Sequence, residues 1–567
     1  MPDQFADKMA MQHRLFSELS RMFGEEVPLY DKALLVNREC NKTVCALLAR
    51  RYTGFSLSDA QLDKASGERH GAIRIGTPAE YNLVTRFFAC FAMEPHNFYD
   101  MSNVGGKSQP IIATAFRSDH SPEHRVFTSL LQTDYFDPQT RHRIESLLAT
   151  RDVFSAKAKE LIEKVERQGG LSWPDADALI REGFEHIFKW TGRARDHQLY
   201  LDLCDSGFKI AADIACFESH HLNHLTPNTF WMDLYTAAMN YALREIDEPA
   251  FRSRASRALK QLSVASDRHY MRLNFKHLSF ETIDGFNSAP VDANTMGEIL
   301  EQLTARLNEP DLNLDTLDHS GFKDTTEGPS EDTPVLLRQD SYKALTEDVL
   351  FTNADGSTMH TVHTARFGEI EQRFFATTKA GRTLYDECLA RAEVEKEKDP
   401  ELPSRDFEAY QTMYARCFAP FPKTLPALLA AGLAYGLYSS TPKGQAARAK
   451  IATTNITELV RLGYVDFDGQ RYEDFLPVSA AGIFASNLNQ YGTKSTAAEK
   501  PVYTQAMLEE IMGREIIDAD EVYAGIEAQS LLDTYASLGL IDTLPPNRHS
   551  SLQLAACGPK PRLAAPR

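Results

Sequence analysis

The stretch "ERHGAIRIG", residues 68–76, places a histidine and an arginine on a short apolar segment. Isoleucines bounded by glycines are typical of a β-strand. Side chains alternate between the two faces of a strand, so His70 and Arg74 share one face while Ile73 and Ile75 take the other. At about 3.3 Å per residue, the His70 and Arg74 Cα atoms lie roughly 13 Å apart. This spacing suits a small dianion held between a metal on the histidine and the arginine fork, but an ordinary half-exposed strand has the same pattern.

A second strand is predicted over residues 359–375, "MHTVHTARFGEIEQRFF", after the turn signal "NADGS". Glu369 and Glu371 are two residues apart and therefore share a face of this strand. A buried carboxylate is costly unless it is paired or bound to a metal. The alternative is a solvated face on which Arg366 or Arg373 pairs with the glutamates. The strand alone leaves both interpretations open.

Three histidines lie close together in "FESHHLNHLTPNT", residues 217–229. His220 and His224 would share a face in either a helix or a strand, with His221 elsewhere. Pro227 disfavours helix at the residue before it, and no glutamate stands between the two histidines as a zinc helix of the H-E-x-x-H type requires. The spacing does not decide between a metal cluster, a helical pair and polar residues near a turn. The pair His360 and His363 in "HTVH" raises the same question.

The composition restricts the class of protein. The 567 residues carry a formal net charge of −18, with 61 Lys and Arg against 79 Asp and Glu. This balance argues against general binding to nucleic acid or to anionic membranes, because phosphate contacts need basic surface. The eight cysteines form no C-x-x-C pair, and we find no apolar run of signal-peptide or membrane-spanning length. We therefore expect a cytoplasmic protein.

The predicted architecture is α+β, without the regular strand–helix alternation of a doubly wound fold. We expect residues 1–390 to form an N-terminal and central metal-binding region that includes a polar insertion at about 308–334. Residues 391–545 are expected to form a helical and mixed region that completes a substrate pocket. The Pro-rich stretch 546–567 is predicted to be a disordered tail. An amphipathic helix is predicted over residues 11–23.

Five motifs together resemble one known family. They are "SGERHGAIRIG", "NHLTPNT", "VLLRQDSYKAL", "HTARFGEIEQR" and "YEDFLPVSAAGIFASNL", and their order is preserved between about residues 30 and 540. They are similar to the 2-oxoadipate dioxygenase/decarboxylase family, also called hydroxyglutarate synthase and formerly a domain of unknown function. The family belongs to the vicinal-oxygen-chelate superfamily, which implies a curved mixed β-sheet core that encloses a metal site, with flanking helices.

The resemblance also implies roles for individual residues. It makes His70, His224 and Glu369 the ligands of Fe(II), with Glu371 as the alternative third ligand. The choice of Glu369 follows 4-hydroxyphenylpyruvate dioxygenase, a similar protein whose ligand glutamate lies just ahead of a like Gln-Arg ending. The arginine of "RHGAIR", Arg74, would bind the distal carboxylate of the substrate. The pocket would also be lined by the pair Val478 and Ser479.

The implied reaction is an intramolecular oxidation in lysine catabolism. The enzyme would convert 2-oxoadipate and O₂ to 2-hydroxyglutarate and CO₂, with no separate 2-oxoglutarate consumed. Two imidazoles and one carboxylate on one face of a metal are typical of non-haem Fe(II) oxygenases. Two alternatives stay open: a related oxygenase that acts on another 2-oxo acid, and a non-catalytic protein that binds a metal or a small acid.

Overall fold

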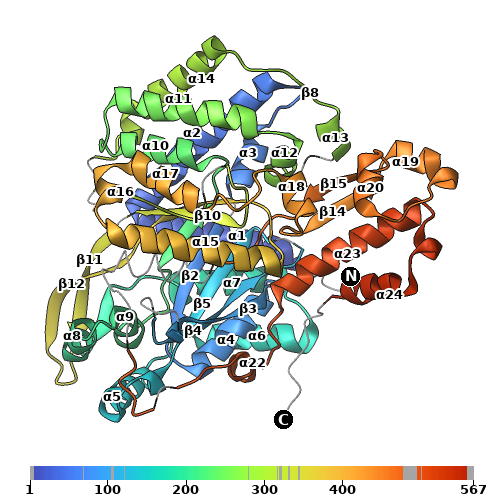
Figure 1. The fold of residues 1–567 in the computed structure, drawn as a ribbon. Helices are drawn as coiled ribbons and strands as arrows, with labels where there is room; N and C mark the ends of the chain where they lie inside the picture. The colour runs from blue at the N-terminus through green and yellow to red at the C-terminus, as the bar shows by residue number, and fades with distance from the viewer. Residues whose placement is uncertain are drawn as a thin grey trace.

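The predicted strand at residues 70–76 lies inside a five-stranded mixed sheet (Figure 1). The computed structural model describes residues 5–67, 69–103, 108–120, 122–276, 278, 280–315, 317, 322–329, 332–342, 345–476, 494–499 and 501–558. In order across the sheet, the strands are β3 (Glu94–Asp100), β4 (Ile111–Arg117), β5 (His124–Leu131), β2 (Arg69–Ile75) and β7 (His224–Pro227). Strand β2 is parallel to β5 and antiparallel to β7, so the two histidine-bearing segments are neighbours.

The register between β2 and β7 brings both histidines to one face of the sheet. His70 is paired with Thr226, and Ala72 is paired with His224. Directly paired residues project to the same side of a sheet, and residues two apart on one strand do so as well. The two isoleucines of β2 point the other way and are completely buried in the core. The face assignment made from the sequence is therefore confirmed.

A three-stranded sheet adjoins this sheet at β7. Its strands, in order, are β13 (Glu369–Arg373), β10 (Leu337–Tyr342) and β9 (Phe322–Glu327). Just beyond the end of β7, Asn228 forms a parallel bridge with Glu371. The backbone N–H of Thr229 donates to the Glu371 carbonyl over 2.8 Å. These contacts bring the glutamate strand β13 alongside the histidine strand β7.

Helix α1 (Lys8–Glu26) covers the apolar core of the five-stranded sheet, as its sequence pattern predicts. Leu15, Phe16, Leu19, Met22 and Phe23 recur at helical spacing, and each is at most 1 % exposed. Asp7 caps the helix by accepting from the Ala10 N–H. The same core receives α4 (Pro78–Ala89), α6 (Ala156–Gln168) and α7 (Trp173–Glu182).

A second helical layer lies above the sheets in Figure 1 and has its own apolar core. It contains α2 (Pro28–Arg51), α10 (Met232–Ala242), α11 (Glu248–Ala265) and α14 (Ala293–Leu307). The smaller helices nearby are α3 (Asp59–Ser66), α12 (Arg268–Asn274) and α13 (Phe280–Asp284). Since α10 follows β7 closely in sequence, this layer anchors the end of the histidine strand.

The remaining elements form the periphery. A third sheet contains β12 (Thr358–Arg366), β11 (Leu345–Thr352) and β6 (Arg193–Arg195), and two short pairs are β14 (Gly436–Ser440) with β15 (Val465–Gly469) and β1 (Tyr52–Thr53) with β8 (Asn287–Ser288). In the part of the chain that the structure describes, the other α-helices are α5 (Pro138–Leu148), α8 (His197–Asp205), α9 (Lys209–Cys216), α15 (Lys379–Lys398), α16 (Leu402–Arg405), α17 (Phe407–Cys417), α18 (Leu425–Ala430), α19 (Pro442–Ala447), α20 (Ile456–Arg461), α22 (Gln505–Met512), α23 (Ala519–Ser537) and α24 (Pro546–Ala556).

The single strand predicted over residues 359–375 is in fact two strands, β12 and β13, in different sheets. The break falls at Phe367 and Gly368. A Cβ atom at Gly368 would lie 2.2 Å from the Tyr342 ring, far inside van der Waals contact. The glycine therefore lets the chain pass close to β10 before Glu369 begins the new strand.

Two peripheral predictions also differ from the structure. Within the predicted polar insertion 308–334, Leu312 and Leu314 are fully buried, and β9 pairs with β10. In the predicted disordered tail 546–567, residues 546–556 form helix α24, on which Arg548 donates to the Tyr535 hydroxyl over 2.9 Å, while residues 559–567 lie outside the described residues. Acidic or Pro-rich composition therefore did not indicate that these segments contain regular secondary structure. Helix α15 runs without a break through residue 390, where the first predicted region ends.

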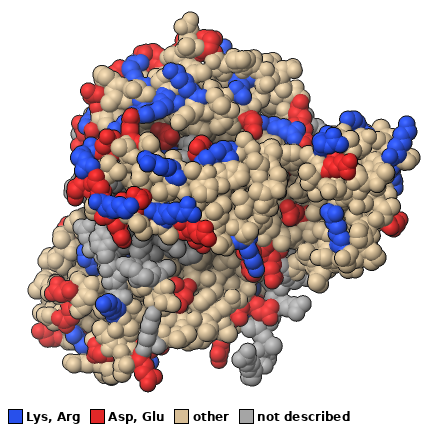
Figure 2. Space-filling view, in the orientation of Figure 1, with Lys and Arg blue, Asp and Glu red and all other residues tan. Residues whose placement is uncertain are grey.

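Charged side chains of both signs are interspersed on the face shown in Figure 2. Among the described residues, no helix is both long and apolar enough to cross a membrane. All eight cysteines are free thiols, and none of them belongs to the histidine and glutamate strands.

Candidate metal centre

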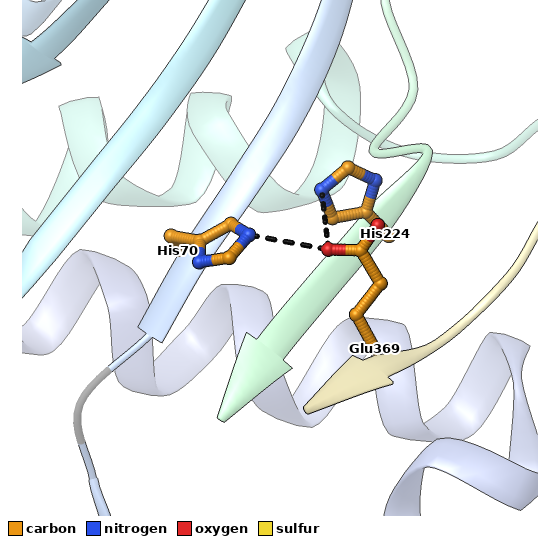
Figure 3. A group of neighbouring side chains, drawn as sticks. All are labelled: His70, His224 and Glu369. Atoms are coloured by element: carbon orange, nitrogen blue, oxygen red, sulfur yellow. Dashed lines mark hydrogen bonds and ion pairs between the residues drawn. The ribbon is translucent and has the colours of Figure 1, made fainter. Parts of the chain in front are cut away.

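Three side chains from three strands converge on one point (Figure 3). They are His70 of β2, His224 of β7 and Glu369 of β13, and one ligand atom from each lies within 4.8 Å of the other two. The Glu369 Oε2 atom lies 3.3 Å from His70 Nε2 and 3.6 Å from His224 Nε2. All three side chains are buried. Among the described residues this is the one group of His, Cys, Asp or Glu side chains with such geometry.

Backbone contacts fix the relative positions of the three strands at this point. The Asn223 N–H donates to the Ala72 carbonyl over 3.0 Å, and the Phe367 N–H donates to the Asn223 carbonyl over 3.2 Å. Asn223 therefore ties the start of β7 to β2 on one side and to the chain just before β13 on the other. This arrangement positions the ligand atoms before any metal arrives.

Aromatic rings enclose the cluster. The Phe475 ring packs edge-on against His70 with centroids 4.9 Å apart, and the Phe367 ring stacks on His224 at 5.2 Å. Phe475 also contacts Phe127 of β5 at 5.4 Å. These rings exclude water, which strengthens electrostatic interactions among the three side chains.

The surroundings of the cluster favour a charged Glu369 and a neutral His224, and they attract positive charge to His70. Burial lowers the pKa of His224 to about 4, so its imidazole is neutral at pH 7 and can offer a lone pair. Burial also opposes the charged forms of the other two groups, but their neighbours outweigh it. The two imidazoles and the Thr226 hydroxyl, which donates to Oε2 over 2.9 Å, hold the pKa of Glu369 below its ordinary value. The carboxylates of Glu371 and Glu369 raise the pKa of His70.

Glu371 lies on the other side of His70 from the cluster. Its Oε2 atom is 2.9 Å from His70 Nδ1, which leaves Nε2 directed at Glu369. Arg373 donates to both Glu371 oxygens, over 2.8 and 2.9 Å. Burial would raise the pKa of Glu371, but Arg373, the His70 ring and Arg125 hold it well below its ordinary value. A carboxylate in this position orients a metal-binding histidine and fixes its tautomer. The geometry therefore favours Glu369 over Glu371 as the third ligand.

Arg74 shares the His70 face of β2, and its side chain is almost fully buried. Its Nη1 atom donates to Asp213 Oδ2 over 2.6 Å. The other oxygen of Asp213 lies 3.1 Å from His363 Nε2 and 3.3 Å from His221 Nε2. The guanidinium is close enough to His224 to lower its pKa. The predicted role of Arg74 in substrate binding stays a prediction.

The other histidines singled out in the sequence lie outside the cluster. His220 contacts Glu80 over 3.3 Å, and both His221 and His363 contact Asp213. His360 is exposed on β12. Of the three histidines in residues 217–229, the structure brings one into the cluster. Val478 and Ser479 lie outside the described residues.

Sequence reasoning missed three residues at the cluster. Gln339 Nε2 lies 3.4 Å from His70 Nε2 and 3.5 Å from Glu369 Oε2. Thr226 and Phe475 make the contacts given above. Each stands inside one of the five quoted motifs, two residues from a proposed ligand in the case of Thr226. Membership of a motif was the available signal, but no local pattern showed which way these side chains point.

Fold and site together define a class: an α+β protein with a buried cluster of two histidines and one glutamate that could hold a metal ion. The family model described as "2-oxoadipate dioxygenase/decarboxylase" matches residues 15–289 and 299–487. The chain belongs to this family.

Individual relatives agree. The 2-oxoadipate dioxygenase/decarboxylase of Pseudomonas putida is 33% identical over 551 residues, which cover 95% of this chain and 99% of that protein. The Escherichia coli protein of the same name is 31% identical over 523 residues, or 90% and 95% of the two chains. The crystal structure of hydroxyglutarate synthase from Pseudomonas putida, in complex with 2-oxoadipate, matches with a TM-score of 0.64 at 31% identity and covers 95% of this chain and all of that one.

We predict that His224→Ala abolishes tight metal binding whereas His221→Ala retains it. The two histidines are both buried, but only His224 faces Glu369, while His221 contacts Asp213. Titration of each purified variant with Co(II), followed by its visible absorption, measures the difference. Equal losses in the two variants would contradict the choice among the histidines.

A second comparison separates the two glutamates of β13. Glu369→Gln removes a proposed ligand and is expected to abolish Co(II) binding under the same conditions. Glu371→Gln leaves the proposed ligands in place but removes the charged partner of His70 Nδ1 and of Arg373, so affinity should fall roughly 10- to 100-fold, as is usual for outer partners of metal-bound histidines. The reverse order of effects would make Glu371 the ligand.

Proposed function

We propose that this chain is a 2-oxoadipate dioxygenase/decarboxylase that converts 2-oxoadipate and O₂ to 2-hydroxyglutarate and CO₂. The observation that carries the proposal is the buried cluster of His70, His224 and Glu369 in a member of this family. The solved relative from Pseudomonas putida, named hydroxyglutarate synthase, is in complex with 2-oxoadipate. The six carbons of the substrate become five in the product and one in CO₂, and both atoms of O₂ are incorporated.

The donor set fits ferrous iron. His70 and His224 would each present one nitrogen, and Glu369 one oxygen, in the two-histidine, one-carboxylate pattern of non-haem Fe(II) oxygenases. When bound, Fe(II) would supply open coordination positions for the 2-oxo acid and for O₂. The orientation of His70 would be held by Glu371, and the Glu369 oxygen by the Thr226 hydroxyl.

Arg74 would bind the carboxylate at the far end of the substrate. It stands four residues along β2 from His70, on the same face, and a guanidinium matches a carboxylate with two parallel N–H···O bonds. The buried carboxylate of Asp213 orients the guanidinium. Holding both ends of the diacid fixes which carbon receives the hydroxyl group, because a misplaced carbon would not react or would react elsewhere.

The apolar rings around the cluster would keep bulk water away from the reacting carbons. Phe475 and Phe367 pack directly on the two histidines. A dry site protects a reactive oxidant from side reactions and strengthens the charge-assisted contacts to the substrate. Val478 and Ser479, a few residues beyond Phe475 in sequence, would complete the pocket wall.

We also infer a vicinal-oxygen-chelate-like core. A mixed sheet and an antiparallel sheet adjoin at β7 and β13, and the cluster lies on the face that they share, which supports this assignment. The division into a region of residues 1–390 and a region of 391–545, and the cytoplasmic location, stay predictions. Phe475 lies in the second region and packs on His70 of the first, so both regions contribute to the site.

Purified protein given Fe(II), O₂ and 2-oxoadipate is expected to consume oxygen and to release CO₂ and 2-hydroxyglutarate in equal amounts. An oxygen electrode and mass spectrometry of the product measure this stoichiometry. Turnover of a different 2-oxo acid only would indicate a related oxygenase. If oxygen uptake stays flat with all 2-oxo acids while metal still binds, the protein is a non-catalytic binder and the proposal fails.

Arg74→Ala should raise the KM for 2-oxoadipate roughly 10- to 100-fold, because a charge-assisted hydrogen bond contributes about 1.5–3 kcal/mol. Co(II) affinity should change little, since Arg74 contacts Asp213 rather than a proposed ligand. The control substrate is 2-oxohexanoate, which lacks the distal carboxylate. Its KM should therefore differ little between the wild type and Arg74→Ala. Loss of metal binding in Arg74→Ala would show that this residue supports the metal centre instead.

A further inference from the structure

Two fully buried arginines lie between the metal centre and the chain segment 471–476, which we call the YED segment. They are Arg125 of β5 and Arg373 of β13. Arg125 is the cross-strand neighbour of His70, Arg373 lies on the same strand as Glu369, and the family resemblance assigns a role to neither arginine. Their contacts nevertheless reach the metal centre in one direction and the YED segment in the other.

In the direction of the metal, both arginines contact Glu371. Arg373 binds both of its oxygens, and Arg125 Nη1 lies 3.5 Å from Oε1. Glu371 in turn contacts His70 Nδ1 over 2.9 Å. A rotation of the Glu371 side chain away from His70 would therefore also break its paired contacts with Arg373. A charged group left unpaired in a buried site is strongly disfavoured.

In the other direction, both arginines bind main-chain carbonyls of the YED segment. Arg373 Nη1 donates to the carbonyls of Tyr472 and Asp474, over 3.1 and 2.8 Å. Arg125 Nε donates to the Glu473 carbonyl over 2.7 Å, and its Nη2 pairs with the Glu473 carboxylate. Three successive carbonyls are thus held by the same two guanidinium groups that hold Glu371.

The YED segment carries Phe475 onto the metal centre. The Phe475 ring lies 4.9 Å from the His70 ring, so a shift of the segment moves a wall of the site. Arg117 of β4 also binds this segment, through the Asp474 carboxylate at 2.9 Å, and the Tyr523 hydroxyl donates to the same carboxylate over 2.6 Å. Among the contacts of the described residues, those of Arg117 reach Asp474 and Asp119 but not Glu371.

We propose that Arg373, assisted by Arg125, is a positioning residue that couples the orientation of the metal ligand His70 to the position of the YED segment. Metal binding at His70 fixes the position of the Glu371 carboxylate, and this fixes the Arg373 side chain that binds it. Arg373 then holds the carbonyls of Tyr472 and Asp474, so that Phe475 stays packed against the site. Because coupling is reciprocal, an ordered YED segment also strengthens metal binding. The inference rests on the proposed function only in taking the cluster as a metal site and the segment as part of the substrate pocket.

The test compares Arg373→Lys with Arg117→Lys in the full-length protein. Both changes keep a positive charge beside the YED segment, but an ammonium is a point donor that does not bridge a carboxylate and two carbonyls at once. Arg373→Lys should weaken Co(II) binding about 10-fold and raise the KM for 2-oxoadipate. Arg117→Lys should also raise the KM but weaken Co(II) binding clearly less than Arg373→Lys does, because Arg117 holds the segment through Asp474 and does not contact Glu371, so His70 keeps its direct support.

Hydrogen exchange gives a second readout, which is measured first in the wild-type protein and then in the two variants. Addition of Co(II) should slow exchange of the amides in a peptide covering residues 470–476, where the Glu473 N–H donates to the Tyr523 hydroxyl. The response should persist in Arg117→Lys and disappear in Arg373→Lys. If Arg373→Lys does not fold, Arg125→Lys replaces it, since Arg125 makes the same two kinds of contact.

The coupling would be overturned if Arg373→Lys bound Co(II) as tightly as the wild type. It would also be overturned if hydrogen exchange at residues 470–476 did not change when Co(II) is added. A purely structural role would lower the melting temperature of both variants without separating their metal affinities. Failure of the proposed function looks different: wild-type protein would bind Co(II), and the segment would respond to it, but 2-oxoadipate would not be consumed.

Discussion

The structure depends on how two neighbouring glutamates of one strand are buried. Glu369 and Glu371 both face the interior, and neither can stay charged there without a partner. The two carboxylates have different partners. Glu371 receives the paired donors of Arg373, whereas Glu369 faces two imidazoles and a hydroxyl. The first arrangement is a complete ion pair, and the second suits a cation better than any protein side chain nearby.

The two roles of the glutamates require a fixed register between the histidine strands and the glutamate strand. A ligand set drawn from β2, β7 and β13 needs three strands whose relative heights are fixed to within a fraction of a residue. The Asn223 backbone and the bridge from Asn228 to Glu371 supply that registration, and Gly368 lets β13 start close to Tyr342. The flanking helices bury the far faces of the sheets but contribute none of the three ligands.

The sequence could predict features that depend on neighbouring residues along the chain, but not features that depend on contacts between distant segments. The strand at 70–76 and the helix around 11–23 were predictable, because alternation and helical spacing are local properties. The break at Gly368 was not, since it depends on the ring of Tyr342 in another strand. The ordered helix α24 was hidden for a similar reason, because its partner Tyr535 lies on α23. For the site, residue types identified candidates, but choosing His224 over His220 and His221 required the family resemblance and then the strand register.

The same reasoning shows why Arg74 and Arg373 are not interchangeable, although both are buried arginines paired with a carboxylate. Arg373 binds a glutamate that also contacts His70 and two main-chain carbonyls, so these contacts are all internal to the protein. Arg74 meets an aspartate whose second oxygen faces two histidines, on the face of β2 that also carries His70. Asp213 thus has three charged or polar neighbours, namely Arg74, His221 and His363. Under the proposed function, a guanidinium oriented in this way would bind the incoming distal carboxylate, and this contact would select a diacid.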